Sequence, residues 1–497
     1  MDAFQFLMNG FIICFQPLNL MFAILGCLLG TIIGVLPGVG PAAGIAMLLP
    51  MTFGIPATSS IIMLSAIYYG AMYGGTITSV LVNVPGEAAS AITCLDGYQM
   101  AKKGRGGAAL AVAAIGSFIG GTVATMGLVL LALPLTAMAL KFGPPEFFSL
   151  MFVGLSLATS LASKSMIRGL ISTVLGLLFA MVGIDPVMGN PRFVFGQTDL
   201  LDGFGIIPIA MGMFGIGELL LIAEGSKTTV INTKLREMWL TWREFKASVF
   251  PIIRGTLIGF FMGLIPGVGV LVPTFLSYGV EKRLSKHPEK FGTGMIEGVA
   301  APETANNAYC NAAMIPLFTL GIPGSAVIAI IMGAFMMHGL IPGPFLFKEH
   351  PEIVWAVIAS FYIGNAVLLI MNLPMIPMWV SMLRIPTPVL YTVILGFCVI
   401  GAYSVHESVF DVGLTLGFGI LGYLYKKLDF PIAPTILTII LGPMMERAMR
   451  SSLDMSRGDF TIFFTRPISV GLLVLAAIFV VSSFFRASAV IKKDTVI

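Results

Sequence analysis

The chain has 497 residues, of which 57% are hydrophobic and only 10% are charged, and its mean hydropathy is +0.97. Soluble domains carry roughly 25% charged residues, so a water-soluble enzyme or binding module is excluded. The formal net charge of +4 is spread over the segments between apolar runs and forms no patch for nucleic acid. Apolar runs long enough for a membrane-crossing helix recur along the chain and predict an all-α polytopic membrane protein.

The first distinctive element in chain order is GCLLGTIIGVLPGVG at 26–40, and it returns as GTLIGFFMGLIPGVG at 255–269. Further along, LVNVPGEAAS at 81–90 is echoed by TLGIPGSAVI at 319–328. Because the echoes keep their order, the chain is expected to contain an internal duplication. We predict a first membrane repeat at 1–224, a charged cytoplasmic linker at 225–250, a second membrane repeat at 251–450, and a C-terminal transmembrane helix with a short cytoplasmic tail at 451–497.

The charges of matching loops predict that the two repeats have opposite orientations. The segment EKRLSKHPEK at 281–290 contains four Lys or Arg residues, whereas its counterpart MTFGIPATSS at 51–60 contains none. Further on the bias reverses, since AKKGRGG at 101–107 is basic and its counterpart LIPGPFLFKEHPE has one Lys and two Glu. Lys and Arg mark cytoplasmic loops. Matching loops therefore lie on opposite sides of the membrane, which defines an inverted repeat.

The Pro-Gly motifs inside both glycine-rich runs predict interrupted helices. The linker and the loop at 281–290 are both basic, so the segment between them enters and leaves on one side. Its arms, about 251–264 and 270–281, are expected to be too short to span the bilayer. LIPGVGV is therefore predicted to be the tip of a re-entrant hairpin, and LPGVGP its mirror image. The triplet Gly26, Gly30 and Gly34 is more simply a helix-packing seam.

Inverted repeats with interrupted helices are typical of secondary transporters, in which half-helix N-termini attract anions and unwound carbonyls coordinate the coupling cation. Polar residues in membrane segments are a functional hypothesis by default, although interhelical hydrogen bonding is the simpler account of any single one. The candidate substrate-binding residues are Gly38, Gly40, Thr76, Thr78, Ser79, Asn83, Pro85, Gly86, Gly267, Gly269, Asn306, Asn307, Asn311, Pro323 and Gly324.

Glu87 and Glu303 are the candidates for ion coupling, although either could simply cap a helix start. Backbone carbonyls near Gly38 and Gly267 are a further candidate contact for Na+. On the residues alone, the coupling ion is either Na+ or H+. Neither the five cysteines nor the four histidines have metal-ligand spacing or catalytic partners, so we expect no metal site, no cofactor and no enzymatic activity.

Taken together, GVLPGVGP, YGGTITSVLVNVPGE, DGYQMAKKGRGGAAL, GLIPGVG and EGVAAPETANNA with TLGIPGS resemble the large membrane subunit of the tripartite tricarboxylate transporter family, TctA. The resemblance covers nearly the whole chain. It implies a multi-pass permease of the bacterial inner membrane that imports tricarboxylates such as citrate, or related carboxylates, by symport with an ion. It also implies a small membrane partner of the TctB type and a periplasmic solute-binding protein of the TctC type. An elevator-like motion follows only by analogy with similar carriers.

Two other classes stay open at this point. An ion or solute channel would need a continuous polar pore, which closed hairpins with few charged residues do not favour. An intramembrane lipid-linked transferase would need an acidic pair or a basic cluster close to a large soluble loop, and the longest predicted extramembrane segment is the linker of about thirty residues.

Overall fold

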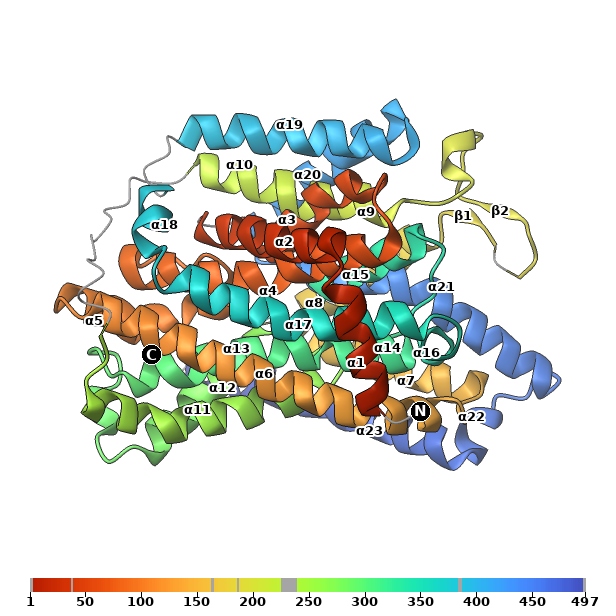
Figure 1. Cartoon of the computed structure of the whole chain (residues 1–497). Coiled ribbons are helices and arrows are strands. Elements are labelled where there is room, and N and C mark those ends of the chain that lie inside the picture. Colours follow the sequence, from red (N-terminus) through yellow and green to blue (C-terminus); the bar gives the residue numbers. More distant parts are fainter. Residues whose placement is uncertain are drawn as a thin grey trace.

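The computed structural model describes residues 3–36, 39–161, 165–185, 187–224, 239–382 and 387–494. Within these ranges the chain is almost entirely helical, and most of the helices run side by side across the molecule (Figure 1). The described strands are β1 (Gly183–Ile184) and β2 (Pro191–Arg192), a short antiparallel pair that projects at one end of the molecule. This confirms the prediction of an all-α polytopic fold.

The helices of the first half are α1 (Ala3–Cys14), α2 (Pro17–Val35), α3 (Gly40–Leu48), α4 (Ala57–Val82), α5 (Thr93–Lys102), α6 (Gly106–Ala139), α7 (Pro144–Leu161), α8 (Met166–Ala180), α9 (Ile206–Ala210) and α10 (Gly217–Ala223). A π-helical segment at Met211–Ile216 joins α9 to α10, and short 3-10 turns occur at Leu49–Thr52, Ala88–Ala91 and Thr198–Leu200.

The second half and the C-terminal segment contain α11 (Trp242–Gly263), α12 (Leu271–Leu284), α13 (Glu297–Ala312), α14 (Met314–Leu320), α15 (Ala326–Met337), α16 (Pro344–Glu349), α17 (Pro351–Asn372), α18 (Ile376–Met382), α19 (Thr387–His406), α20 (Val409–Lys427), α21 (Ile432–Met455), α22 (Ile462–Thr465) and α23 (Pro467–Asp494). Part of the predicted linker, residues 225–238, lies outside the described residues, and α11 begins within its remaining portion.

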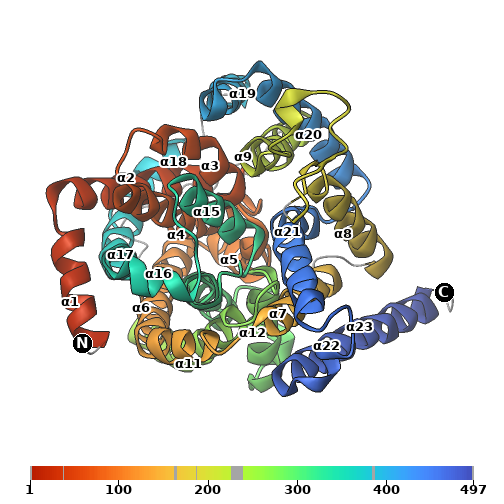
Figure 2. The same cartoon turned by 90° about the vertical axis from the view of Figure 1, so that its right-hand side faces the viewer.

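Six helices among the described residues are long and apolar enough to cross a membrane, namely α2, α4, α6, α11, α17 and α21. The apolar stretch of α4 is completely buried inside the protein. Figure 2 shows α4 in the interior of the helix bundle, with α2, α17, α6 and α15 around it. A helix that avoids both water and lipid can carry polar side chains that lipid would not tolerate.

The triplet Gly26, Gly30 and Gly34 is a packing seam, as predicted, and its counterpart in the second half is one as well. A Cβ atom on any of these glycines would lie 2.1–3.0 Å from a backbone carbonyl oxygen of the neighbouring helix, which is closer than van der Waals contact allows. Only glycine lets the two backbones approach so closely. The pairs of glycine and carbonyl residue are Gly26–Met63, Gly30–Ile67 and Gly34–Ala71 between α2 and α4, and Gly255–Ala301, Gly259–Ala305 and Gly263–Tyr309 between α11 and α13.

These pairs also establish the direction of each half. Residue numbers rise together along both seams, so α2 is parallel to α4 and α11 is parallel to α13. Where α4 meets α13, the numbers change in opposite senses, because Thr76 contacts Glu303 whereas Tyr68 lies beside Cys310. Helices α4 and α13 are therefore antiparallel, and so are α2 and α11. Matching elements run in opposite directions, which agrees with the predicted inverted repeat.

The predicted length of the first hairpin arm in the second half is wrong. Helix α11 has 22 residues and is long enough to cross a membrane, because its helix extends back to Trp242; α12 has only 14. The hairpin itself is present, since Arg254 on α11 forms an ion pair with Glu281 near the end of α12. That contact holds the open end of the hairpin together on one side of the molecule.

Candidate functional site

Each Pro-Gly break contacts the hairpin of its own half. In the first half, a Cβ atom on Gly86 would lie 2.2 Å from the carbonyl oxygen of Gly34, at the end of α2. In the second half, the N–H of Gly267 donates to the carbonyl oxygen of Gly324 at 3.1 Å. Gly267 has φ +81°, a conformation that favours glycine. Each Pro-Gly break therefore packs against the hairpin of its own half, at the end of α2 in the first half and at the tip in the second.

The first Pro-Gly break begins at Asn83, whose backbone conformation ends helix α4. Asn83 ends α4 with φ +59°, and its counterpart in the repeat, Gly321, ends α14 with φ +70°. Asn and Gly are the residues that most readily adopt this left-handed conformation. Asn83 therefore ends helix α4. Its side chain is exposed, and its predicted contact with substrate stays a prediction.

Both breaks end at an N-cap. The carboxylate of Glu87 accepts a hydrogen bond from the N–H of Ser90 at 3.0 Å, and the Ser325 hydroxyl accepts one from the N–H of Ile328 at 3.3 Å. The capping role that the sequence left open for Glu87 is therefore present. Serine at the matching position shows that a cap alone does not require a carboxylate.

Glu303 lies in α13 and is almost completely buried, with 1% of its surface exposed. Its carboxylate accepts hydrogen bonds from the Thr76 hydroxyl of α4, at 2.5 Å, and from the Thr93 hydroxyl of α5. Glu87 is close enough to interact with it electrostatically, and Asn306 donates to the Glu87 carboxylate at 3.4 Å. The structure thus brings Glu87, Glu303, Asn306 and Thr76 together at the contact between the halves.

Neither of these carboxylates forms an ion pair with any Lys or Arg among the described residues, which distinguishes them from Glu281 and Glu146, although the buried Asp96 also has no such partner and accepts backbone N–H groups instead. Glu281 pairs with Arg254, and Glu146, which is 2% exposed, pairs with Arg466. A buried carboxylate without a counter-charge is costly unless it is protonated or bound to a cation. This part of the site can therefore take up a proton or a cation.

Asn307 and Asn311 have different surroundings. The amide nitrogen of Asn311 donates to the Gly121 carbonyl at 2.9 Å and to the Thr125 hydroxyl at 3.0 Å, which joins α13 to α6. The amide nitrogen of Asn307 donates to Ser117 at 2.7 Å, but its buried oxygen has no partner in the described part of the chain. Asn311 therefore links α13 to α6 by hydrogen bonds, whereas the side-chain oxygen of Asn307 is an acceptor without a partner in the described residues.

A small cavity lies between α4, α6 and α17, and two of its lining residues, Thr76 and Ser117, donate hydrogen bonds to Glu303. Its volume of about 10 Å³ is near the minimum for one water molecule. Thr76 and Ser117 line it, and so do Tyr73 and Asn372, each of which has a buried polar atom without a partner in the described residues. These groups provide the polar partners that an ordered water requires.

The remaining candidates do not all join this cluster. The hydroxyls of Thr78 and Ser79 donate to the Gly75 carbonyl of their own helix, each at 3.0 Å. Gly40 and Gly269 have φ +63° and +70°, with open space where a side chain would lie. Pro85 and Pro323 lie in the two breaks, and Gly38 lies outside the described residues. The predicted Na+ contacts near Gly38 and Gly267 remain predictions.

Three polar residues of the site were not predicted. Thr93 and Ser117 contact Glu303 and Asn307 from positions about 200 residues away in sequence, and no spacing signal links them. Ser325 is different, because aligning the two repeats places it opposite Glu87. Aligning the two repeats therefore predicts the N-cap at Ser325.

Comparison with known proteins identifies the family of the chain. Residues 20–437 match the tripartite tricarboxylate transporter TctA family. The chain is 47% identical over 476 residues, 96% of its own length and 95% of the relative's, to an "Uncharacterized 52.8 kDa protein in TAR-I ttuC' 3'region" of Agrobacterium vitis. It is also 46% identical over 223 residues, 45% of its length and 92% of the relative's, to an "Uncharacterized protein in TAR-II ttuC' 3'region" of the same organism. No solved structure matches. The chain belongs to the tripartite tricarboxylate transporter TctA family.

Proposed function

We propose that this chain is the large permease subunit of a binding-protein-dependent secondary transporter that uses an ion gradient to import tricarboxylates such as citrate, or related carboxylates, across the bacterial inner membrane. Membership of the TctA family supports a tripartite system with a small TctB-like membrane subunit and a TctC-like periplasmic binding protein. The transporter moves its substrate unchanged and needs no cofactor besides the coupling Na+ or H+.

One observation carries the proposal. Glu87 from the first repeat and Glu303 from the second are both buried and lie close together, and neither forms an ion pair with a Lys or Arg of the described residues. Discontinuous helices of inverted repeats place ion and substrate sites near the bilayer midplane. A coupling cation that neutralises one of these carboxylates would link the two repeats through a single charge.

The anionic substrate needs donors, and these lie at the same contact. The second Pro-Gly break precedes the N-terminus of α15, which Ser325 caps, and the N-terminus of a helix favours an anion. The amides of Asn306 and Asn307 can supply further donors. An elevator-like movement of one part of the chain against a scaffold would give alternating access to this site.

The proposal is tested by uptake of radiolabelled citrate into proteoliposomes that contain this chain and its small membrane partner. The binding protein is added outside, and sodium and proton gradients are imposed separately. We expect accumulation that requires the binding protein and follows one gradient. Flux that equilibrates under either gradient without accumulation would instead indicate a channel and would contradict the proposal. If citrate is inert, the same assay with smaller dicarboxylates tests the substrate assignment alone.

A further inference from the structure

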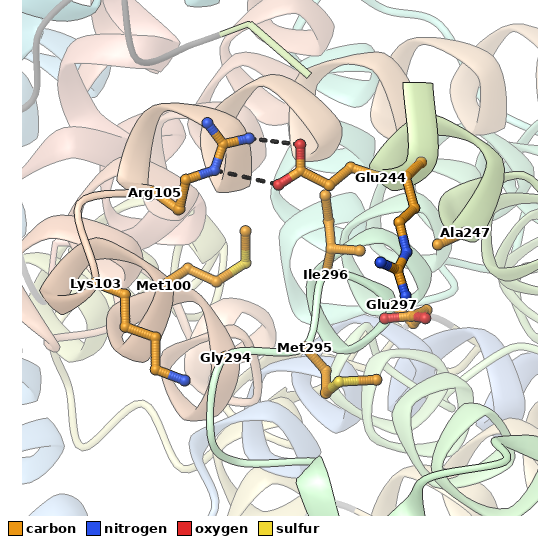
Figure 3. Close-up of a pocket in the computed structure, with 10 residues that line it drawn as sticks. Met100, Lys103, Arg105, Glu244, Ala247, Gly294, Met295, Ile296 and Glu297 are labelled. Carbon is orange, nitrogen blue, oxygen red and sulfur yellow. Dashed lines mark hydrogen bonds and ion pairs between the residues drawn. The ribbon is translucent and has the colours of Figure 1, made fainter. Parts of the chain in front are cut away.

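A second cavity, of about 270 Å³, lies apart from the Glu303 cluster (Figure 3). It forms where the end of α5, the start of α6, the first turns of α11 and the loop before α13 meet, so both repeats contribute to it. This end of the molecule has the basic sequences 101–107 and 281–290, and such sequences mark the cytoplasmic side. Its charged lining residues are Lys103, Arg105, Arg243, Glu244 and Glu297.

The charges of the lining do not cancel. Arg105 forms a forked contact with Glu244, at 2.5 and 3.2 Å, which Figure 3 shows as two dashed lines. Lys103 donates one hydrogen bond to a backbone carbonyl, that of Thr293, at 2.6 Å and keeps its charge unpaired. Arg243 is exposed and has no partner in the described residues. Lys103 and Arg243 carry two positive charges and Glu297 carries one negative charge, so the lining has one net positive charge.

The wall of the cavity is fixed by hydrogen bonds. The loop at 292–295 is held by Asp96, which is fully buried. The Asp96 carboxylate accepts hydrogen bonds from the N–H groups of Gly292, Gly294 and Met295, at 2.7–3.0 Å. The cavity is therefore a defined site, because one carboxylate sets the position of its loop.

The apolar surroundings of the cavity are typical of the membrane boundary. Trp239 and Trp242, at the start of α11, are 80% and 71% exposed, and Trp242 stacks on Phe245. Exposed tryptophans of this kind lie at the level of the lipid headgroups. Inside the cavity, Met100, Ala247 and Ile296 provide apolar contacts. A ligand with an anionic head and an apolar stem fits this combination.

We propose that this cavity binds the phosphate headgroup of an anionic phospholipid, with Arg243 and Lys103 as the phosphate contacts. Basic pockets between membrane helices on the cytoplasmic side are suited to such headgroups. The lipid contacts α5 and α6 of the first repeat together with α11 of the second, and so it stabilises their contact at this end. Free phosphate has the same head chemistry, but the exposed tryptophans favour the lipid.

The test counts lipids that remain bound. The protein is reconstituted in nanodiscs of phosphatidylcholine with about one-fifth phosphatidylglycerol, extracted, and examined by native mass spectrometry. We expect at least one retained phosphatidylglycerol on the wild type and its loss in Arg243→Gln combined with Lys103→Gln. Lys246→Gln is the matched control, because Lys246 lies on the same helix but does not line the cavity. Arg243→Lys keeps the charge and should keep the lipid.

Equal lipid retention in the folded double variant and in Lys246→Gln would overturn the proposal. Inorganic phosphate and citrate are then added to lipid-free protein in detergent, and the melting temperature is measured. A shift with phosphate that depends on Arg243 and equals the shift with phosphatidylglycerol would assign the site to a soluble anion and overturn the lipid assignment. A shift with citrate alone would make the cavity part of the substrate path and would also overturn the lipid assignment. None of these measurements depends on uptake.

Discussion

Helices α4 and α13 have equivalent places in the two repeats but present different chemistry. Met63 and Ala301 contact equivalent glycines, Gly26 and Gly255, and aligning the repeats on them makes Ser65 the equivalent of Glu303. In the same register Tyr68, Tyr69 and Tyr73 correspond to Asn306, Asn307 and Asn311. The two repeats therefore share the backbone contacts, whereas their polar rows differ: α4 presents a serine and tyrosines where α13 presents a carboxylate and amides.

This difference shows that the site is asymmetric even though the scaffold is symmetric. Close packing of the two backbones tolerates only glycine at the seam, so both halves have glycine at these positions. The residues that face the other half have no such restriction. As a result, the carboxylate of Glu303 lies at one end of the contact between α4 and α13, where it meets Thr76, whereas Tyr68 lies beside Cys310 at the other end.

The largest effect is expected at Glu303, which has no carboxylate counterpart on α4. Glu303→Gln keeps an oxygen that can accept from Thr76 but removes the charge. If Glu303 binds the coupling ion, gradient-driven uptake should fall by at least about 10-fold, the equivalent of about 1.4 kcal/mol. Proteoliposome uptake measures this, with the exposed Glu289→Gln as control. Wild-type accumulation by Glu303→Gln would remove the carboxylate from the coupling mechanism.

Glu87 allows the two roles at its position to be separated, because the second repeat supplies the control. Glu87→Ser copies the cap that Ser325 provides, whereas Glu87→Ala removes cap and charge together. We expect Glu87→Ser to keep its melting temperature and to lose about 10-fold in coupled uptake. Glu87→Ala should lose uptake and also about 1 kcal/mol of stability. Normal uptake by Glu87→Ser would leave Glu87 with the cap as its only role.

Asn307 and Asn311, two of the asparagines of α13, allow function and packing to be compared within one helix. Asn307→Ala should abolish uptake while the protein still inserts into the membrane and loses no more stability than Asn311→Ala, because it breaks one hydrogen bond to α6, that to Ser117, and removes a buried oxygen that has no partner in the described residues. Asn311→Ala breaks two interhelical hydrogen bonds and should lower stability by about 0.6–2 kcal/mol, with uptake retained at low temperature. The reverse pattern in paired uptake and thermal-unfolding assays would exchange the two assignments.

The sequence predicted the repeated elements and missed contacts between distant segments. The glycine seam, the two Pro-Gly breaks and the opposite orientation of the halves follow from motifs that recur in order. The contact of Thr93 with Glu303 and the ion pair of Arg254 with Glu281 join segments that no repeat relates. The length of α11 was missed because its capping box at Thr241 and Glu244 lies in a charged segment that reads as linker.

A smaller effect is expected at the hairpin tip. Gly267 and Gly269 both have left-handed φ, of +81° and +70°, so alanine at either position costs about 1–2 kcal/mol. A Cβ atom on Gly267 would also lie 2.3 Å from the Gly154 carbonyl oxygen, whereas Gly269 faces open space. Gly267→Ala should therefore destabilise the protein more than Gly269→Ala in thermal unfolding. Equal losses would show that α7 moves aside at little cost.

The smallest effect concerns a carboxylate that, unlike Glu303, has cationic partners. The N–H groups of Met188 and Val187 donate to Asp185 and, together with Arg450 and Arg192, lower its pKa to about 2. A lowered folded-state pKa contributes stability that is present above the unfolded pKa of about 3.9 and is lost as pH falls toward 2. Asp185→Asn should therefore be less stable than the wild type at pH 6, and the difference should shrink as pH falls from about 4 to 2. Thermal unfolding in detergent across this range measures the difference, and a gap that stays constant with pH would mean that Asp185 holds the loop through its shape and not its charge.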